Sequence, residues 1–250
     1  MPCLFFYHFT APYYMTGLLL IFLGGAILCR NRNIQAFVGG VVLVCLGLSI
    51  YQAFVSLFLS LLLIFFFREV TEQNEWTASK LLREILWFCG ACVAIALVYL
   101  LSVKISNLLN HTKLLDYKGI SSMGSASISD YVGRIKLALY LYLFPNKSDR
   151  YAFLFPYRLA DCYFLVIVCS ALLISRTALR LRKTPLKMVT ILLVLAFFPF
   201  ASNFIYIACD ASDIYTLVLF GQLAPFLLLV CLADWLLPSA RYRSDWKKLI

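Results

Sequence analysis

The chain has 250 residues, of which 63% are hydrophobic and 14% are charged. Soluble domains are about 45–50% apolar and about one quarter charged, so this composition excludes an ordinary water-soluble globular protein. The 22 Lys and Arg residues exceed the 12 Asp and Glu residues and give a net charge of +10, but they interrupt long apolar runs, which indicates topology signals and contacts with anionic lipid and excludes nucleic acid as a partner.

The first apolar run covers residues 11–29 and predicts a membrane span that Arg30 and Arg32 close. The second run, residues 34–67, contains no charged side chain. A single helix of this length would be ~50 Å long, whereas the hydrocarbon core of a bilayer is about 30 Å thick. The second run therefore predicts a hairpin of two short spans.

The turn of this hairpin is predicted at Tyr51 and Gln52, the markedly polar pair at the midpoint of the run. The two spans are then residues 34–50 and 53–67. This turn places Arg68 on the same side of the membrane as the basic residues that follow the first span, as the positive-inside rule requires.

The polar segment after Arg68 predicts a cytoplasmic connector in which Trp76 anchors at the membrane interface. Residues 85–103 form the fourth predicted span, which crosses outward. The polar residues 104–158 that follow are predicted to form one large outer loop.

A helix is predicted inside this loop. Ser127 and Asp130 have the spacing of a capping box and predict a helix from Asp130 to Phe144. Its apolar part is too short to span a membrane, and Tyr131 and Tyr140 suit a helix that lies at the membrane surface.

Three further apolar runs predict the last spans, at residues 159–175, 188–208 and 214–233. The turn between the first two carries basic residues and no acids, the strongest cytoplasmic signal in the chain: Arg176, Arg180, Arg182, Lys183 and Lys187. The basic C-terminal tail is predicted to be cytoplasmic too. The fold class is thus all-α, one polytopic helical membrane domain over residues 1–250, with about seven spans and one large extracytoplasmic loop that contains an interfacial helix.

Seven spans and a cytoplasmic tail require an outer N-terminus, yet nothing ahead of Ala11 resembles a translocated domain or its signal. One interpretation is that Met1 begins partway through a longer polytopic protein. The alternative is that the hairpin at Tyr51 and Gln52 is miscounted.

The predicted spans contain essentially no charged residue, which disfavours ion pumps and charge-driven carriers. The outer loop instead collects acids and bases, which suits an enzyme that acts on a lipid-linked phosphate. Arg150 and Arg158 are the predicted phosphate contacts, because they flank the aromatic apolar segment YAFLFPY that can lie beside a lipid carrier. The alternative for each of these residues is a solvated loop.

Other motifs indicate structure more than chemistry. His111 has neither HxxxH nor HExxH spacing, so no metal site is predicted. Cys89 and Cys92 form a CxxC inside an apolar run and are interpreted as packing residues. Asp210 and Asp213 are either a paired-acid site or, more often for such residues, the ends of two helices in a tight turn. No nucleotide-binding glycine motif is present, and no cofactor is predicted.

The segment GLSIYQAFVSLFLSLLLIFFF resembles the Tyr-Gln-containing double span of the bacterial glucosyltransferase-II family, polytopic enzymes that add glucosyl groups to O-antigen. The downstream order is similar as well: a long outer loop, a basic turn and a span pair beginning MVTILLVLAFFPFASNFIYI. The resemblance implies a GT-C-type transferase in the bacterial inner membrane, with a polyprenyl-phosphate sugar as donor and a glycan as acceptor. Tyr51 and Gln52 are the residues that it carries over individually, as donor-binding residues.

The family also implies a carboxylate near the first outer loop as the catalytic base. No Asp or Glu precedes Ala11, so the catalytic residue is unassigned and expected upstream, and this chain alone is expected to have weak or no transferase activity. The leading prediction is a membrane glycosyltransferase of lipopolysaccharide O-antigen or a similar glycan, or a fragment of one. The alternative is a non-enzymatic carrier that moves a lipid-linked sugar across the bilayer.

Overall fold

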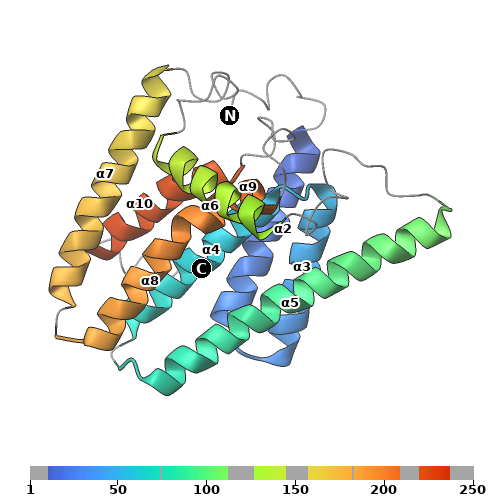
Figure 1. Ribbon diagram of the computed structural model, residues 1–250. Coiled ribbons are helices and arrows are strands. Elements are labelled where there is room, and N and C mark those ends of the chain that lie inside the picture. The colour runs from blue at the N-terminus through green and yellow to red at the C-terminus, as the bar shows by residue number, and fades with distance from the viewer. Residues whose placement is uncertain are drawn as a thin grey trace.

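The computed structural model describes residues 11–73, 75–111, 127–144, 157–181, 183–208 and 220–236 (Figure 1). These residues form helices joined by short connections, without a strand, which confirms the all-α prediction for the described part of the chain. The elements are α2 (Ala11–Arg30), α3 (Ile34–Ile50), α4 (Phe54–Glu72), α5 (Ala78–Leu109), α6 (Ile128–Leu143), α7 (Tyr157–Arg180), α8 (Pro185–Ser202), α9 (Phe204–Ala208), the 3-10 helix η5 (Phe220–Leu223) and α10 (Ala224–Leu236).

Four of these helices, α2, α4, α5 and α8, are long and apolar enough to cross a membrane. Shorter apolar stretches lie in α3, in α7, and over η5 and α10. The described residues therefore have the character of a polytopic membrane protein. The number of seven spans, the single-domain assignment and the outer position of residues 104–158 stay predictions.

The predicted hairpin turn at Tyr51 and Gln52 is confirmed. α3 ends at Ile50, Tyr51 is extended with φ −155° and ψ 111°, and α4 starts at Phe54. α4 then continues beyond residue 67 to Glu72. A helix therefore covers the third predicted span, residues 53–67, from its second residue and continues five residues past it.

The segment predicted as a connector after Arg68 is formed largely by the end of α4 and the start of α5, and its cytoplasmic position stays a prediction. α5 begins at Ala78, where the Thr77 hydroxyl caps it by accepting a hydrogen bond from the Lys80 amide at 3.4 Å. No Pro interrupts the helix, which continues to Leu109, so residues 104–109 are helical and not loop.

The prediction that Trp76 anchors at the membrane interface is wrong, because its side chain packs inside the bundle. Its side chain is 9% exposed, its Nε1 donates a hydrogen bond to Thr190 Oγ1 at 3.3 Å, and its ring centroid lies 6.1 Å from that of Phe66. The short connection between α4 and α5 folds the indole inward against α8, where its polar edge finds a partner.

The helix predicted at the membrane surface is present as α6. The Ser127 Oγ accepts from the Asp130 amide at 3.2 Å, and the Asp130 carboxylate accepts from the Ser127 amide at 3.1 Å, so the predicted capping box is confirmed. α6 lies across the ends of α8 and α9 in Figure 1. One face is buried there through Ala138 and Leu141, while the opposite face leaves a row of apolar side chains exposed: Ile128, Val132, Ile135, Leu139 and Leu143. This row suits contact with lipid.

The sixth predicted span, residues 188–208, is wrong as a single helix. α8 ends at Ser202, Asn203 is not helical, and the short α9 follows. Pro199 weakens the last turn of α8, because proline has no amide hydrogen to donate inside a helix.

Helices lie over the fifth predicted span and over the described part of the seventh, with different limits. α7 contains residues 159–175 and extends beyond them at both ends. Residues 214–219 lie outside the described residues, and the remainder of the seventh span begins as η5 and continues in α10 to Leu236.

Glycines allow α2 and α3 to approach closely. A Cβ on Gly40 would lie 2.5 Å from Leu28 Cγ, and a Cβ on Gly24 would lie 2.8 Å from Val44 Cγ2. Such small residues let backbones pack tightly inside a bilayer, where burial of apolar surface gives little drive for association. The α2–α3 pair is therefore held by close packing.

The connections between the helices gather at two ends of the bundle. The α2–α3, α4–α5 and α7–α8 connections lie at the lower end in Figure 1, and the α3–α4 turn and α6 lie toward the upper end. At the lower end, Lys187 Nζ of α8 donates a hydrogen bond to the Gln73 carbonyl after α4. We call it the basic end, after Arg30, Arg32, Arg68 and Lys187, and we call the opposite end the α6 end.

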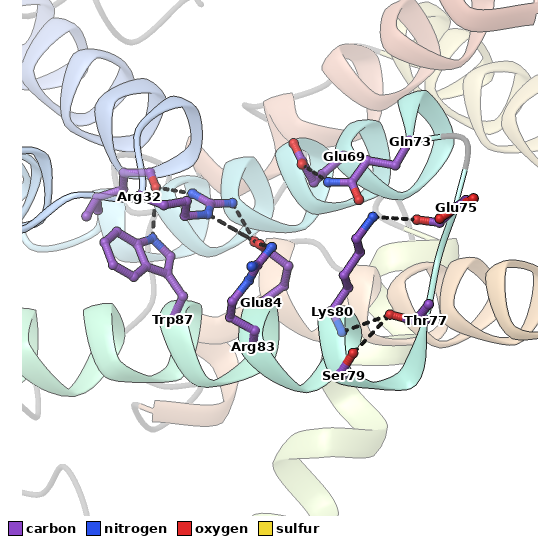
Figure 2. A network of polar contacts seen from close by, with 11 residues as sticks. Arg32, Glu69, Gln73, Glu75, Thr77, Ser79, Lys80, Arg83, Glu84 and Trp87 are labelled. Atoms are coloured by element: carbon purple, nitrogen blue, oxygen red, sulfur yellow. Dashed lines mark hydrogen bonds and ion pairs between the residues drawn. The ribbon is translucent and has the colours of Figure 1, made fainter.

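A buried ion pair ties α5 to the α2–α3 connection at the basic end (Figure 2). Glu84 of α5 is 2% exposed, and its Oε2 lies 2.5 Å from Nη2 of Arg32. The Arg32 guanidinium also lies 5.5 Å from the ring of Trp87, whose Nε1 donates to the Leu28 carbonyl at 2.9 Å. These contacts fix the start of α5, most of whose further surface faces away from the bundle.

Two adjacent glycines in α3 give a matched test of the helix packing. Gly40→Leu is expected to lower the free energy of unfolding by about 1–3 kcal/mol, because the side chain overfills the α2 contact. Gly39→Leu is expected to leave stability unchanged, since no atom lies within 4 Å of a Cβ built there. Unfolding of the detergent-purified variants measures this difference, and equal effects would contradict the packing.

The buried ion pair is expected to matter more than an exposed one. Glu84→Gln should lower the free energy of unfolding by about 2–4 kcal/mol, because Arg32 then lacks its partner in a partly buried position. Glu72→Gln is the control: Glu72 pairs with Arg68, and both side chains are more than half exposed, at 53% and 59%, so the loss should be below about 1 kcal/mol. The same unfolding measurement compares them, and an equal loss would refute the role of burial.

Candidate functional site

The predicted donor-binding pair lies at the turn between α3 and α4. The Tyr51 ring meets the rings of Tyr14 and Phe54 edge-on, with centroid distances of 5.0 and 5.4 Å. Gln52 Nε2 donates a hydrogen bond to the Tyr99 hydroxyl of α5 at 2.5 Å. Gln52 is half-buried, so it joins α5 to the turn and remains accessible on one side.

Hydrogen bonds join the break between α8 and α9 to α6 and α4. Asn203 is 1% exposed, and its Nδ2 donates to the Ala138 carbonyl of α6 at 2.9 Å. Ser56 of α4 is fully buried, and its Oγ accepts from the Ile205 amide of α9 at 3.1 Å. Non-helical backbone at membrane depth is tolerated where protein atoms satisfy it, and the Ser56 hydroxyl does so for the Ile205 amide. The contact with Ala138 satisfies the buried side-chain amide of Asn203.

The 3-10 helix η5 closes on the same break. A Cβ on Gly221 would lie 1.8 Å from the Ser202 carbonyl oxygen and 2.7 Å from Ser56 Cβ, so only glycine permits this approach. The next residue, Gln222, is 4% exposed, and its Oε1 has no hydrogen-bond partner among the described residues. A buried amide oxygen without a partner is costly in a folded protein, and it can accept a hydrogen bond from a ligand hydroxyl.

These side chains form one neutral group that we call the polar junction: Ser56, Ser60, Ser202, Asn203 and Gln222. It joins α4, α8, α9 and η5 beneath α6. Its groups are hydroxyls and amides, which bind hydroxyl-rich ligands by hydrogen bonds and do not supply a charge.

Arg134 adds a positive charge to the α6 end. Its Nη1 donates a hydrogen bond to the Ala208 carbonyl at 3.4 Å, and its guanidinium lies 5.7 Å from the Tyr131 ring. Tyr142 lies on α6 about two helical turns after Arg134. Burial raises its pKa well above the ordinary value, so its phenol stays protonated at neutral pH. Asp130, the acid of this helix, takes part in the capping box.

The other predicted site residues are placed only in part. Arg150 lies outside the described residues, as do Asp210 and Asp213. Arg158 lies in the first turn of α7, and its side chain is outside the described set. The structure therefore brings Tyr51 and Gln52 into one turn and does not test whether the two arginines join them.

The remaining candidates behave as structural residues where they are described. His111 is exposed and has φ 48°, in the turn that ends α5. Within the described ranges, no group of three His, Cys, Asp or Glu side chains is placed to hold a metal ion. Cys89 and Cys92 are free thiols of α5.

Sequence reasoning missed the polar junction. Ser56, Asn203 and Gln222 are single polar residues in apolar runs, and each was included in a predicted span without comment. The available signal was Pro199 followed by Ser202 and Asn203, since proline near a pair of small polar residues indicates a helix end. Tyr99 and Arg134 gave no such signal, because their roles depend on which helix lies opposite.

Comparison with known proteins connects this architecture to a family. A family model described as Glucosyl transferase GtrII matches residues 1–226, which include the α3–α4 turn, α6 and the polar junction. No match is found among curated proteins or solved structures. Because the match covers most of its length, the chain belongs to the Glucosyl transferase GtrII family.

Proposed function

We propose that the chain is a membrane glucosyltransferase that takes glucose from a polyprenyl-phosphate donor and passes it to O-antigen or a similar cell-surface glycan. Membership of the Glucosyl transferase GtrII family implies a glycosyltransferase with a sugar donor and an acceptor. The apolar helices support a membrane enzyme. The carrier predicted as an alternative gains no support from the family match.

The proposed orientation puts the basic end in the cytoplasm of a bacterial inner membrane and the α6 end on the outer side. Its support is the concentration of Arg and Lys at the basic end, which the positive-inside rule places in the cytoplasm. Asp234, near the end of α10, interacts electrostatically with Arg68 of α4. The C-terminal tail that follows α10 would then also be cytoplasmic.

The observation that carries the proposal is the polar junction beneath α6. It is a helix break with buried amides and hydroxyls, set at the end of the bundle opposite the buried Arg32–Glu84 pair. Such breaks are typical of substrate sites in membrane proteins. The exposed apolar row is on the other face of α6, where it suits contact with surrounding lipid. The sugar hydroxyls are proposed to bind at the junction and the phosphate to bind basic residues at the α6 end.

The proposed chemistry is displacement at the anomeric carbon of glucose. An acceptor hydroxyl oxygen forms the new bond while a carboxylate base removes its proton, and the bond to the phosphate oxygen breaks with its electron pair leaving on the phosphate. Arg150 and Arg158 are proposed to hold the phosphate, since arginine forms paired, charge-assisted hydrogen bonds with phosphate oxygens. Tyr51 and Gln52 are proposed to contact the donor beside it. The base is unassigned.

Arg158 and Arg176 give a matched test, because they lie toward opposite ends of α7. Arg158→Gln is expected to weaken binding of short-chain polyprenyl-phosphate glucose about tenfold or more, the effect of losing charge-assisted hydrogen bonds. Arg176→Gln, toward the basic end, should leave binding unchanged. Donor binding is measured on the purified chain by equilibrium partition of radiolabelled donor, so the test does not depend on the unassigned base.

The same preparation, reconstituted with an O-antigen acceptor, separates transferase from carrier. Labelled glucose that appears on the glycan supports transfer. Labelled donor that crosses the vesicle membrane without forming a glycan product would favour the carrier. Equal donor affinity in the two arginine variants would remove Arg158 from the site.

Variants of Gln52 and Tyr99 test whether Gln52 contacts the donor or only holds α5 against the α3–α4 turn. Gln52→Leu is expected to weaken donor binding about tenfold if the amide contacts the donor, the cost of one lost hydrogen bond to a charged group. Tyr99→Phe removes the partner of Gln52 and leaves the amide in place, so it should change donor binding by less than about threefold. The two dissociation constants decide the matter. Equal losses would show that Gln52 only braces α5 against the turn.

A further inference from the structure

A groove at the basic end has no role in the proposed transfer reaction. It lies between α3 and α5 and has a volume of about 500 Å³. Its walls are apolar, formed by Phe37, Leu82, Leu86 and Trp87, and Gly90 and Arg83 also line it. The groove thus combines a long apolar lining with one cation.

The walls of the groove are held in place. Trp87 Nε1 donates to the Leu28 carbonyl at 2.9 Å, and its ring lies 5.1 Å from the Phe37 ring, edge-on. Leu82 and Leu86 are 58% and 63% exposed, so a bound molecule can contact both. No atom lies within 4 Å of a Cβ built on Gly90, which leaves that part of the groove open.

Arg83 supplies a net positive charge beside the groove, because the carboxylate beside it is already paired with another arginine. The Arg83 side chain is 68% exposed, and its nearest carboxylate is Glu84, at 3.9 Å. Glu84 is held by Arg32 at 2.5 Å, so its negative charge is already compensated (Figure 2). Arg83 therefore retains a positive charge for an anion at the edge of the groove.

The position of Arg83 also fits a lipid boundary. It precedes the charge-free stretch that starts at Ile85, by about half a helical turn. A molecule that lies in the groove would put its apolar part along Leu86 and Gly90 and its polar part at Arg83. That is the shape of a membrane phospholipid with its headgroup at the interface.

We propose that the groove is a binding site for an anionic phospholipid, phosphatidylglycerol, in the leaflet at the basic end. One acyl chain occupies the apolar groove between α3 and α5, and the phosphate pairs with Arg83. Basic pockets between membrane helices bind anionic headgroups in this way. A zwitterionic lipid would bring its own cation close to Arg83 and is bound less well.

Trp87 reports directly on the lipid in the groove. The full chain, with Trp235 and Trp246 replaced by Phe, is reconstituted in vesicles of phosphatidylcholine and phosphatidylglycerol in which one of the two lipids carries brominated acyl chains. Bromine quenches indole fluorescence on contact. Trp76 is retained because it is buried and hydrogen-bonded to Thr190, so it adds a constant background.

At equal mole fractions, brominated phosphatidylglycerol is expected to occupy the groove about fivefold more than brominated phosphatidylcholine, the factor that one basic side chain near an anionic headgroup supplies. Arg83→Gln should remove this preference. Gly90→Leu should also remove the preference, because the new side chain fills the groove. This variant tests the site without altering its charge.

Two controls match these variants. Lys80→Gln removes a charge at the same end from a side chain that does not line the groove, and whose Nζ donates to the Glu75 carbonyl at 3.0 Å. Gly39→Leu makes the same substitution as Gly90→Leu at a glycine of α3 outside the groove. Both should keep the preference.

Three results would overturn the proposal. Equal quenching by the two brominated lipids in the parent would mean that Trp87 contacts bulk lipid only. If Lys80→Gln and Arg83→Gln lowered the preference for phosphatidylglycerol equally, the preference would come from the overall positive charge of the basic end and not from Arg83. A preference that survives Gly90→Leu would mean a headgroup contact without an occupied groove.

Discussion

Lipid offers no water to a backbone amide or carbonyl, and this constraint governs each described feature of the chain. Between the two ends the backbone is helical, because a helix satisfies its own polar groups. Where the helix stops, protein atoms replace the missing bonds. Ser56 accepts from the Ile205 amide at the start of α9. The side-chain amide of Asn203 donates to the Ala138 carbonyl of α6, so the polar side chain at the break also has a protein partner. The candidate site forms at this break because side chains of α4 and of the break itself supply the hydrogen bonds there.

The polar side chains differ between the two ends of the bundle: they are charged at the basic end and neutral in the polar junction at the α6 end. At the basic end, charged side chains are paired or reach the interface, and the buried Arg32–Glu84 pair fixes α5 to the rest of the bundle. At the α6 end, the buried groups are neutral amides and hydroxyls. A neutral, hydrogen-bonding lining avoids the cost of a buried charge in the absence of substrate, and it leaves the charge of a donor phosphate to be met by arginines nearer the interface.

The proposed lipid groove and the proposed reaction site lie toward opposite ends of the bundle, and α5 contributes residues near both. α5 contacts the bundle at Glu84 and Trp87 near its start, at Ala91 and Ile95 in its middle and at Tyr99 beyond them. A phospholipid seated at Arg83 would add a contact where α5 begins, and Gln52 holds α5 where the donor is proposed to bind. The two proposals rest on separate residues and can fail independently.

The amino-acid sequence was enough to predict the all-α class, the hairpin turn at Tyr51 and Gln52, the capping box of α6 and the family resemblance. Each of these depends on local properties: apolar length, a polar pair in an apolar run, or side chains three residues apart. The packing of the helices against one another settles that Asn203 ends a helix, that Trp76 turns inward and that Gly221 lies against Ser56. Those outcomes depend on which helices lie opposite one another, because a single serine or amide in an apolar run has the same local signature whether it faces lipid or completes a junction.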